Sequence, residues 1–211
     1  WYPVFVHDLY TTHLFVFDMF AGSGMDIEGA HGSPLILLEE AKGAQYEHCK
    51  ALKLSSNKKK VFFIFNEFLK PKYESLTNNV DSFQNKCMEA NCCSDCPIKE
   101  GIFTRNEDFQ NLFADKKIDK IFKSKEYGKF VLLDQYGIKQ VTEDVFFKLV
   151  NSPKTDFIFF ISSSTITRFK ELPSIKQYFD TNKLDFDDVQ PKECHRLIKE
   201  YFENLIPNSK D

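Results

Sequence analysis

Four uninterrupted runs of apolar residues divide the chain into strand-like segments, at 13–18, 60–67, 129–137 and 156–164. Each run holds at least four consecutive Val, Ile, Leu or Phe residues, without alternation of polar and apolar positions. Runs of this kind are typical of parallel strands that are buried on both faces. A shorter run at 101–104 predicts a fifth strand, because a helix-like pattern follows it almost at once.

Helix-like segments separate these strands, so strand and helix alternate along the chain. The segments lie at 33–52, 69–83, 111–128, 142–152 and 191–206. The alternation predicts an α/β fold: a Rossmann-like, doubly wound, mostly parallel sheet with right-handed crossovers. No repeat or low-complexity tract interrupts it, so we expect one domain over 1–211. Because the chain starts at Trp1 rather than Met, we expect this domain to be incomplete at both ends.

Composition narrows the classes of function. The 28 basic and 31 acidic residues give a net charge of −3, so no overall positive field attracts nucleic acid. Most of the 23 phenylalanines lie in strand-like runs, which predicts a core packed with aromatic rings. There is no apolar segment of membrane length and no signal peptide, so we expect a cytoplasmic protein without a membrane partner.

Acidic residues end three of the strong strands: Asp18, Glu67 and Asp134. The carboxyl ends of parallel strands meet at one edge of a sheet, where ligands of open α/β folds bind. A single such acid is explained by the low β propensity of Asp and Glu. Three acids in register favour a ligand site.

The residues around these acids indicate the ligand's chemistry. Gly22 and Gly24 follow Asp18 and let the backbone approach a ligand closely. Glu67 is placed to accept hydrogen bonds from a ribose diol, and Asp108, after the short strand, from an adenine amino group. Carboxylates without a basic loop suit a cationic, phosphate-free nucleoside, which is the chemistry of S-adenosylmethionine.

The stretch "FDMFAGSG" resembles the first motif of class I S-adenosylmethionine-dependent methyltransferases. With "GSPLILLEEA", "KVFFIFNE", "LLDQYGIKQVTEDVF" and "TDFIFFISSSTITRF", the chain resembles the three-Cys-motif partner family (TcmP), bacterial proteins paired with a three-cysteine, radical-SAM-like protein. The resemblance runs from about Leu14 to Arg168 and implies a methyltransferase-like fold. It implies cofactor contacts from Asp18, Phe20, Ala21, Gly22, Gly24, Glu67 and Asp108.

Two departures from the methyltransferase pattern leave alternatives open. "MDIEGAH" delays the first helix, which we expect to begin at Ser33 as N-cap with Pro34 at the first helical position. The delayed loop either closes on a ligand or fills its place. "DQYG" keeps Asp134 and Tyr136 as candidate catalytic residues facing a methyl acceptor, such as a nucleic-acid base, but lacks the prolines of adenine methyltransferases.

Enzyme and binding module therefore both stay open. The retained acids favour a methyltransferase, whereas the two departures favour a non-catalytic module that acts with a three-cysteine partner protein. A metal-dependent nuclease is disfavoured, because no Lys stands beside the carboxylates in the motifs.

Four cysteines form a Cys-rich insertion at about 86–97, namely Cys87, Cys92, Cys93 and Cys96. Clustering of this kind in a cytosolic protein suggests metal or redox chemistry. A structural zinc site, an iron–sulfur cluster and plain thiols are the alternatives. The insertion falls between a helix and the following strand, at the edge opposite the acids. We therefore expect it to be structural or partner-facing.

Overall fold

The computed structural model describes residues 1–44, 46–54, 59–89, 98–135, 137–162, 165, 168 and 193–206. The chain divides into two compact units. The first consists of Trp1–Asp134 and Ser152–Ile158, and the second of Gln135–Asn151 and Phe159–Asp211.

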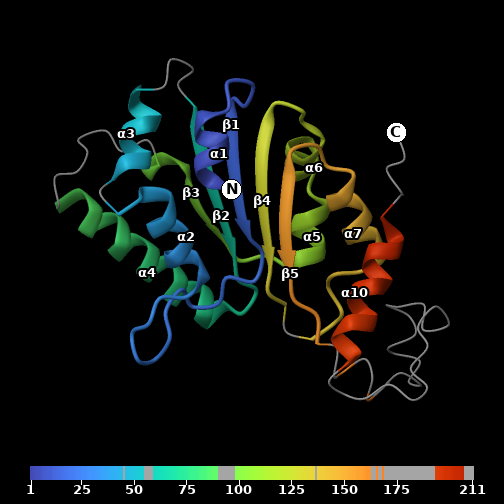
Figure 1. Ribbon diagram of the computed structural model, residues 1–211. Helices are drawn as coiled ribbons and strands as arrows, with labels where there is room; N and C mark the ends of the chain where they lie inside the picture. The colour runs from blue at the N-terminus through green and yellow to red at the C-terminus, as the bar shows by residue number, and fades with distance from the viewer. Residues whose placement is uncertain are drawn as a thin grey trace. The chain divides into compact units, whose positions relative to one another are not determined.

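A five-stranded parallel sheet forms the centre of the first unit (Figure 1). Its strands are β1 (His13–Asp18), β2 (Lys60–Asn66), β3 (Ile102–Arg105), β4 (Tyr127–Leu133) and β5 (Thr155–Phe159). Their order is β3-β2-β1-β4-β5, with β1 paired in parallel to both β2 and β4. This order belongs to doubly wound dinucleotide-type sheets, so the predicted Rossmann-like, methyltransferase-like fold class is confirmed.

Helices cover both faces of this sheet. Those of the first unit are α1 (Tyr2–His7), α2 (Ser33–Lys42), α3 (Glu47–Leu54), α4 (Lys70–Glu89), α5 (Phe109–Ala114) and α6 (Lys116–Lys123), with a 3-10 turn at Lys99–Gly101. Leu14 and Val16 of β1 belong to the core that α1 to α4 complete. Phe17, which points the other way, packs its ring 5.4 Å from that of Phe122 in α6. Burial on both faces explains why the strand sequences do not alternate.

The predicted helices differ from the observed ones at two breaks. The segment 33–52 forms two helices, because Gly43 ends α2 with a φ of 77° that favours glycine. The segment 111–128 also divides, because the side chain of Asp115 accepts hydrogen bonds from the amides of Lys117 and Ile118 and starts α6. The short helix α1 has no counterpart in the sequence prediction.

The second unit contains α7 (Glu143–Val150) and α10 (Cys194–Leu205). Its described core is aromatic: the ring of Phe202 lies 4.9 Å from both Phe146 and Phe159. Tyr201 donates a hydrogen bond to Glu143, which joins α10 to α7. None of the helices in the described ranges is long and apolar enough to cross a membrane.

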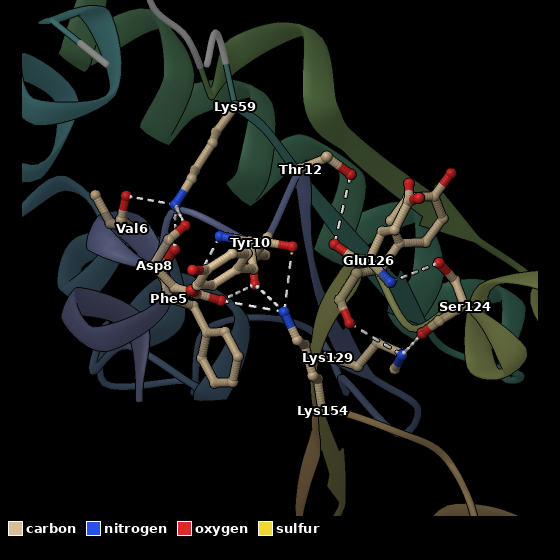
Figure 2. Close-up of polar contacts among 12 residues, drawn as sticks. Phe5, Val6, Asp8, Tyr10, Thr12, Lys59, Ser124, Glu126, Lys129 and Lys154 are labelled. Atoms are coloured by element: carbon tan, nitrogen blue, oxygen red, sulfur yellow. Dashed lines mark hydrogen bonds and ion pairs between the residues drawn. The ribbon is translucent and has the colours of Figure 1, made fainter. Parts of the chain in front are cut away.

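Three lysines gather at the amino edge of the sheet, where the strands begin (Figure 2). Lys59 donates to the carbonyl oxygens of Phe5 and Val6, both at 2.8 Å, and to that of Asp8, so its ammonium closes the C-terminal end of α1. Lys129 is fully buried and donates to the carbonyls of Ser124 and Tyr127 at 2.7 and 3.0 Å.

Lys154 completes this edge by pairing with Asp8, whose carboxylate lies 3.2 Å from the ammonium. It also donates to the carbonyl oxygen of Tyr10 at 3.2 Å. Asp8 accepts from the Thr11 hydroxyl and the Tyr10 amide, and these bonds, followed by Lys154, lower its pKa to about 2. The amino edge is thus a closed polar network that ties α1 and the strand ends together.

Candidate functional site

The predicted acids meet at the carboxyl edge of the sheet, the end opposite the lysine network. Asp18 is the last residue of β1, beside Phe65 of β2 and Leu132 of β4. Glu67 and Asp134 each come directly after the end of a neighbouring strand. The negative charges of Asp134 and Glu67 both act on Asp18, so the three acids lie within electrostatic reach of one another.

Asp18 itself is fully buried, and both of its oxygens are occupied. Oδ1 accepts from the amide of Phe20 at 3.2 Å, and Oδ2 accepts from the hydroxyl of Ser33 at 2.6 Å. Burial, with smaller contributions from the charges of Asp134 and Glu67, raises its pKa to about 6 against the lowering effect of these hydrogen bonds. Asp18 therefore anchors the start of α2 to the end of β1.

The prediction that Ser33 is the N-cap of the delayed helix is wrong. Gly32 occupies that position without a side-chain cap, and the Ser33 hydroxyl turns to Asp18 instead. The hydroxyl gains more there, because a buried carboxylate needs a donor more than a helix end that water can reach. Because α2 begins at Ser33, Pro34 is the second residue of the helix, one position later than predicted.

The two glycines of the turn after β1 have different surroundings. Both have positive φ, 62° for Gly22 and 76° for Gly24. A Cβ on Gly24 would lie 3.2 Å from the Leu76 side chain of α4, whereas a Cβ on Gly22 would meet nothing within 4 Å. Gly24 thus lets the turn pack on α4, while Gly22 borders open space that a ligand can enter.

The remaining residues predicted to contact a cofactor flank this turn. Ala21 is buried, and its amide donates to the carbonyl oxygen of Asn66 at 2.8 Å. The ring of Phe20 is partly exposed and lies 5.0 Å from that of Phe109, the first residue of α5. These contacts join the turn after β1 to the loops after β2 and β3.

The loop of residues 25–31, which delays the start of α2, forms a hairpin that projects from the fold and is drawn as the blue loop below α2 in Figure 1. Met25 and His31 form an antiparallel bridge, and Asp26 Oδ1 accepts from the amides of Glu28 and Ala30 at 2.9 and 2.8 Å. Ile27 at its tip is fully exposed. The tip is therefore not packed into the sheet edge, and of the two alternatives for this loop, filling the ligand's place loses support.

Glu67 comes directly after β2, is 9% exposed, and uses one of its two carboxylate oxygens for the backbone. Its Oε1 accepts from the amide of Leu69 at 2.7 Å. Asn106 Nδ2 donates to the carbonyls of Glu67 and Phe68 at 2.7 and 2.8 Å, which fixes the loop that carries the acid. Phe68, next to Glu67, is 63% exposed and offers an aromatic surface at this edge.

Asn66 organises the edge, and the sequence analysis did not single it out. Its Nδ2 donates to the carbonyls of Met19 and Glu107, at 3.3 and 3.0 Å, and its Oδ1 accepts from the Glu107 amide at 3.1 Å. The buried side chain thus ties the loops after β1, β2 and β3 together. The sequence signal for this role is the amide side chain of Asn66 directly before the strand-end acid Glu67. An amide buried there must form hydrogen bonds with other groups.

Asp108 is the N-cap of α5. Its Oδ1 accepts from the amides of Gln110 and Asn111, at 2.9 and 3.2 Å. Both bonds use the same oxygen. Like Glu67, Asp108 therefore combines a structural bond to the backbone with a second oxygen at the carboxyl edge.

The candidate catalytic pair is described only in part. Asp134 is exposed at the end of the first unit, and Tyr136 lies outside the described residues. In the second unit, the side chain of Gln135 is buried. Its Nε2 donates to the Phe160 carbonyl at 3.2 Å, and its Oε1 accepts from the amides of Gln140 and Val141.

The cysteine cluster is likewise mostly outside the described residues, which include Cys87 but not Cys92, Cys93 or Cys96. Cys87 lies in the last turns of α4, a helix that runs further than the predicted 69–83. Across the described part of the chain, no group of three or more His, Cys, Asp or Glu residues is arranged to hold a metal. The zinc prediction gains no support from these residues.

The comparison with known proteins does not carry an assignment of function. No family model and no curated protein matches the chain. A solved structure from Streptococcus pneumoniae, titled "a putative tRNA (m1A22) methyltransferase", covers 97% of both chains at 11% identity with a TM-score of 0.28. At this level of likeness, function has to be argued from the site itself.

Proposed function

We propose that the carboxyl edge of the first unit binds S-adenosylmethionine and that the protein is a methyltransferase. The observation that carries the proposal is the shared geometry of Glu67 and Asp108. Each uses one carboxylate oxygen to hold a backbone amide, and each has a second oxygen at the same edge. Between them and the open side of Gly22, a nucleoside can be held from several directions.

The charge at this edge favours a cation without phosphates. The residues from Asp18 to Gly32 contain no Lys or Arg, so the glycine turn has none of the positive charge of a phosphate-binding loop. The acids Glu67, Asp108 and Asp134 suit a ligand with a sulfonium, hydroxyl groups and an amino group. S-adenosylmethionine has these three features and no phosphate.

In this proposal each residue has a specific role. Glu67 accepts from the ribose hydroxyls, Asp108 accepts from the adenine amino group, and the exposed ring of Phe68 covers the adenine. Phe20, Ala21, Gly22 and Gly24 shape the turn beside the methionine part. Asp18 acts through Ser33 by holding the turn and the start of α2 in place.

The acceptor side is assigned to Asp134 and Tyr136 from the sequence motif. A nucleic-acid base is the proposed acceptor class: its amine attacks the methyl carbon in line with the sulfonium, and the carbon–sulfur bond breaks to leave S-adenosylhomocysteine. The proton that the nitrogen loses passes to Asp134 or to water. The protein's contribution is alignment and exclusion of water rather than strong acid–base chemistry.

A binding module that acts with a three-cysteine partner protein is the second candidate. The exposed hairpin of residues 25–31, with the apolar side chain of Ile27 at its tip, favours it as a surface for a protein partner. This candidate predicts cofactor binding without methyl transfer, or no cofactor binding.

Titration calorimetry with S-adenosylmethionine tests the proposal. We expect micromolar binding that Glu67→Gln weakens about tenfold or more, because a hydrogen bond to a charged group contributes about 1.5–3 kcal/mol. Glu74→Gln, at an exposed position of α4, is the matched control and should bind like the wild type. A folded wild-type protein that binds no S-adenosylmethionine would contradict the proposal.

A further inference from the structure

A groove of about 260 Å³ runs between α2 and α4, outside the cofactor site proposed above. Both helices follow parallel strands, so they run in the same direction and the groove has two distinct ends. At the end near the helix starts, the lining consists of Met25 and His31 of the hairpin and Leu35 of α2. At the other end it is cationic, with Lys42 of α2 and Lys86 of α4.

Several side chains of α4 line this groove because helical spacing places them on one face of the helix. Asn79, Ser82, Phe83 and Lys86 all line it, and positions three, four and seven residues apart share one face of a helix. Lys42 contributes from the opposite wall, seven residues after Leu35. Lys42 of α2 and Ser82 and Lys86 of α4 thus line one groove from two helices.

Lys42 is held in position by aromatic rings rather than by an acid. Its Nζ lies 5.5 Å from the ring centroid of Tyr46 and 5.4 Å from that of Phe83. Such contacts orient an ammonium without neutralising it. Neither Lys42 nor Lys86 forms an ion pair with a carboxylate in the described part of the chain.

The acid that lines the groove among the described residues, Glu39, faces another partner. Its Oε1 lies 3.7 Å from Nδ1 of His31. Lys42 and Lys86 therefore line the groove without a carboxylate partner among the described residues, while Glu39 adds one negative charge to the same groove. An ammonium without a carboxylate partner keeps its hydrogen-bond donors for an anion, so this end of the groove suits a phosphate.

We propose that this groove binds a small phosphorylated molecule. The phosphate dianion lies between Lys42 and Lys86 with Ser82 donating to it, and the ligand's apolar body extends along Met25 and Leu35. A lysine ammonium binds phosphate well, and two of them match a dianion. A polynucleotide fits less well, because the groove is short and the chain's net charge of −3 does not attract a polyanion.

A backbone amide NMR titration with phenyl phosphate tests this site directly. Inorganic phosphate and phenol serve as partial ligands, and ionic strength is kept constant throughout. We expect saturable shifts at Lys42, Ser82 and Lys86, with phenyl phosphate binding at least tenfold more tightly than inorganic phosphate and phenol causing no saturable shift. Shifts that follow ionic strength alone, or no saturation at tens of millimolar, overturn the proposal.

Charge-removing variants locate the binding. Lys42→Met and Lys86→Met keep the aliphatic stem that packs on the groove walls, so each should fold and each should weaken phenyl phosphate at least tenfold. Lys72→Met removes a lysine of α4 that does not line the groove, and should leave the affinity unchanged. Equal weakening by Lys72→Met overturns the site. The proposal is also overturned if a single-stranded oligonucleotide binds saturably while phenyl phosphate does not bind.

Discussion

The two edges of the central sheet both carry charged side chains, yet they use them in opposite ways. At the amino edge, Lys59, Lys129 and Lys154 direct their ammonium groups at backbone carbonyls (Figure 2). At the carboxyl edge, Glu67 and Asp108 each use one carboxylate oxygen to accept from backbone amides. The amino edge is therefore a structural network, whereas the carboxyl edge is the proposed ligand site.

The contrast teaches that charge alone does not mark a site. Three lysines at one edge of a sheet would suggest an anion site from the sequence, but their donors are already engaged. Asp18 gives the same lesson within the carboxyl edge, because both of its oxygens are occupied and no part of it is exposed. Spare hydrogen-bonding capacity is what separates a functional charge from a structural one.

The largest expected effect is at the amino edge. Lys59→Met removes the donor to three carbonyl oxygens at the end of α1 and should lower the free energy of unfolding by about 3–4 kcal/mol. Urea unfolding measures it, with the exposed neighbour Lys60→Met, expected to change stability by less than about 0.5 kcal/mol, as control. Equal stability of the two variants would contradict a structural network at this edge.

The second effect is a pH dependence due to Asp18. Its folded pKa of about 6 lies above the ordinary value of 3.8, so between these pH values the folded protein binds more protons than the unfolded chain. Stability therefore falls as pH rises through this window, by roughly 3 kcal/mol at 1.36 kcal/mol per pKa unit. The stability of the Asp18→Asn variant should not show this fall between pH 4 and pH 7. Urea midpoints at pH 4 and pH 7 compare the two proteins, and parallel curves would disprove the assignment.

The smallest expected change in stability comes from removing either of two helix-capping carboxylates, which are expected to differ in their effect on cofactor binding. Asp108 and Asp115 both cap a helix by accepting from two amides, so Asp108→Ala and Asp115→Ala should each cost about 1 kcal/mol of stability. Only Asp108 lies at the proposed cofactor site, so only its variant should also weaken S-adenosylmethionine. Calorimetry and urea unfolding on the two variants decide this, and equal loss of affinity would remove Asp108 from the site.

The sheet could be predicted from the sequence because its signals are local. Uninterrupted apolar runs located four strands, a short stretch before a helix-like pattern located the fifth, and strand-end acids such as Glu67 marked the edge where they meet. Gly22 and Gly24 predicted a turn from residue type alone, since positive φ favours glycine.

The polar network could not be predicted, because its partners are far apart in the sequence. Ser33 was expected to cap its own helix, but its hydroxyl is taken by Asp18 across the turn. Asn66 joins three loops, and Lys59 reaches back to α1, contacts that exist only once the sheet has brought these segments together. Local propensity does not contain this information.

An amide NMR titration with S-adenosylmethionine tests the contrast between the two edges most directly. The account predicts saturable shifts for Gly22, Glu67 and Asp108, with the amides of Lys59 and Lys129 unchanged. A folded protein that shows no saturable shifts, or shifts centred on the amino edge, would contradict the claim that the carboxyl edge is the ligand site.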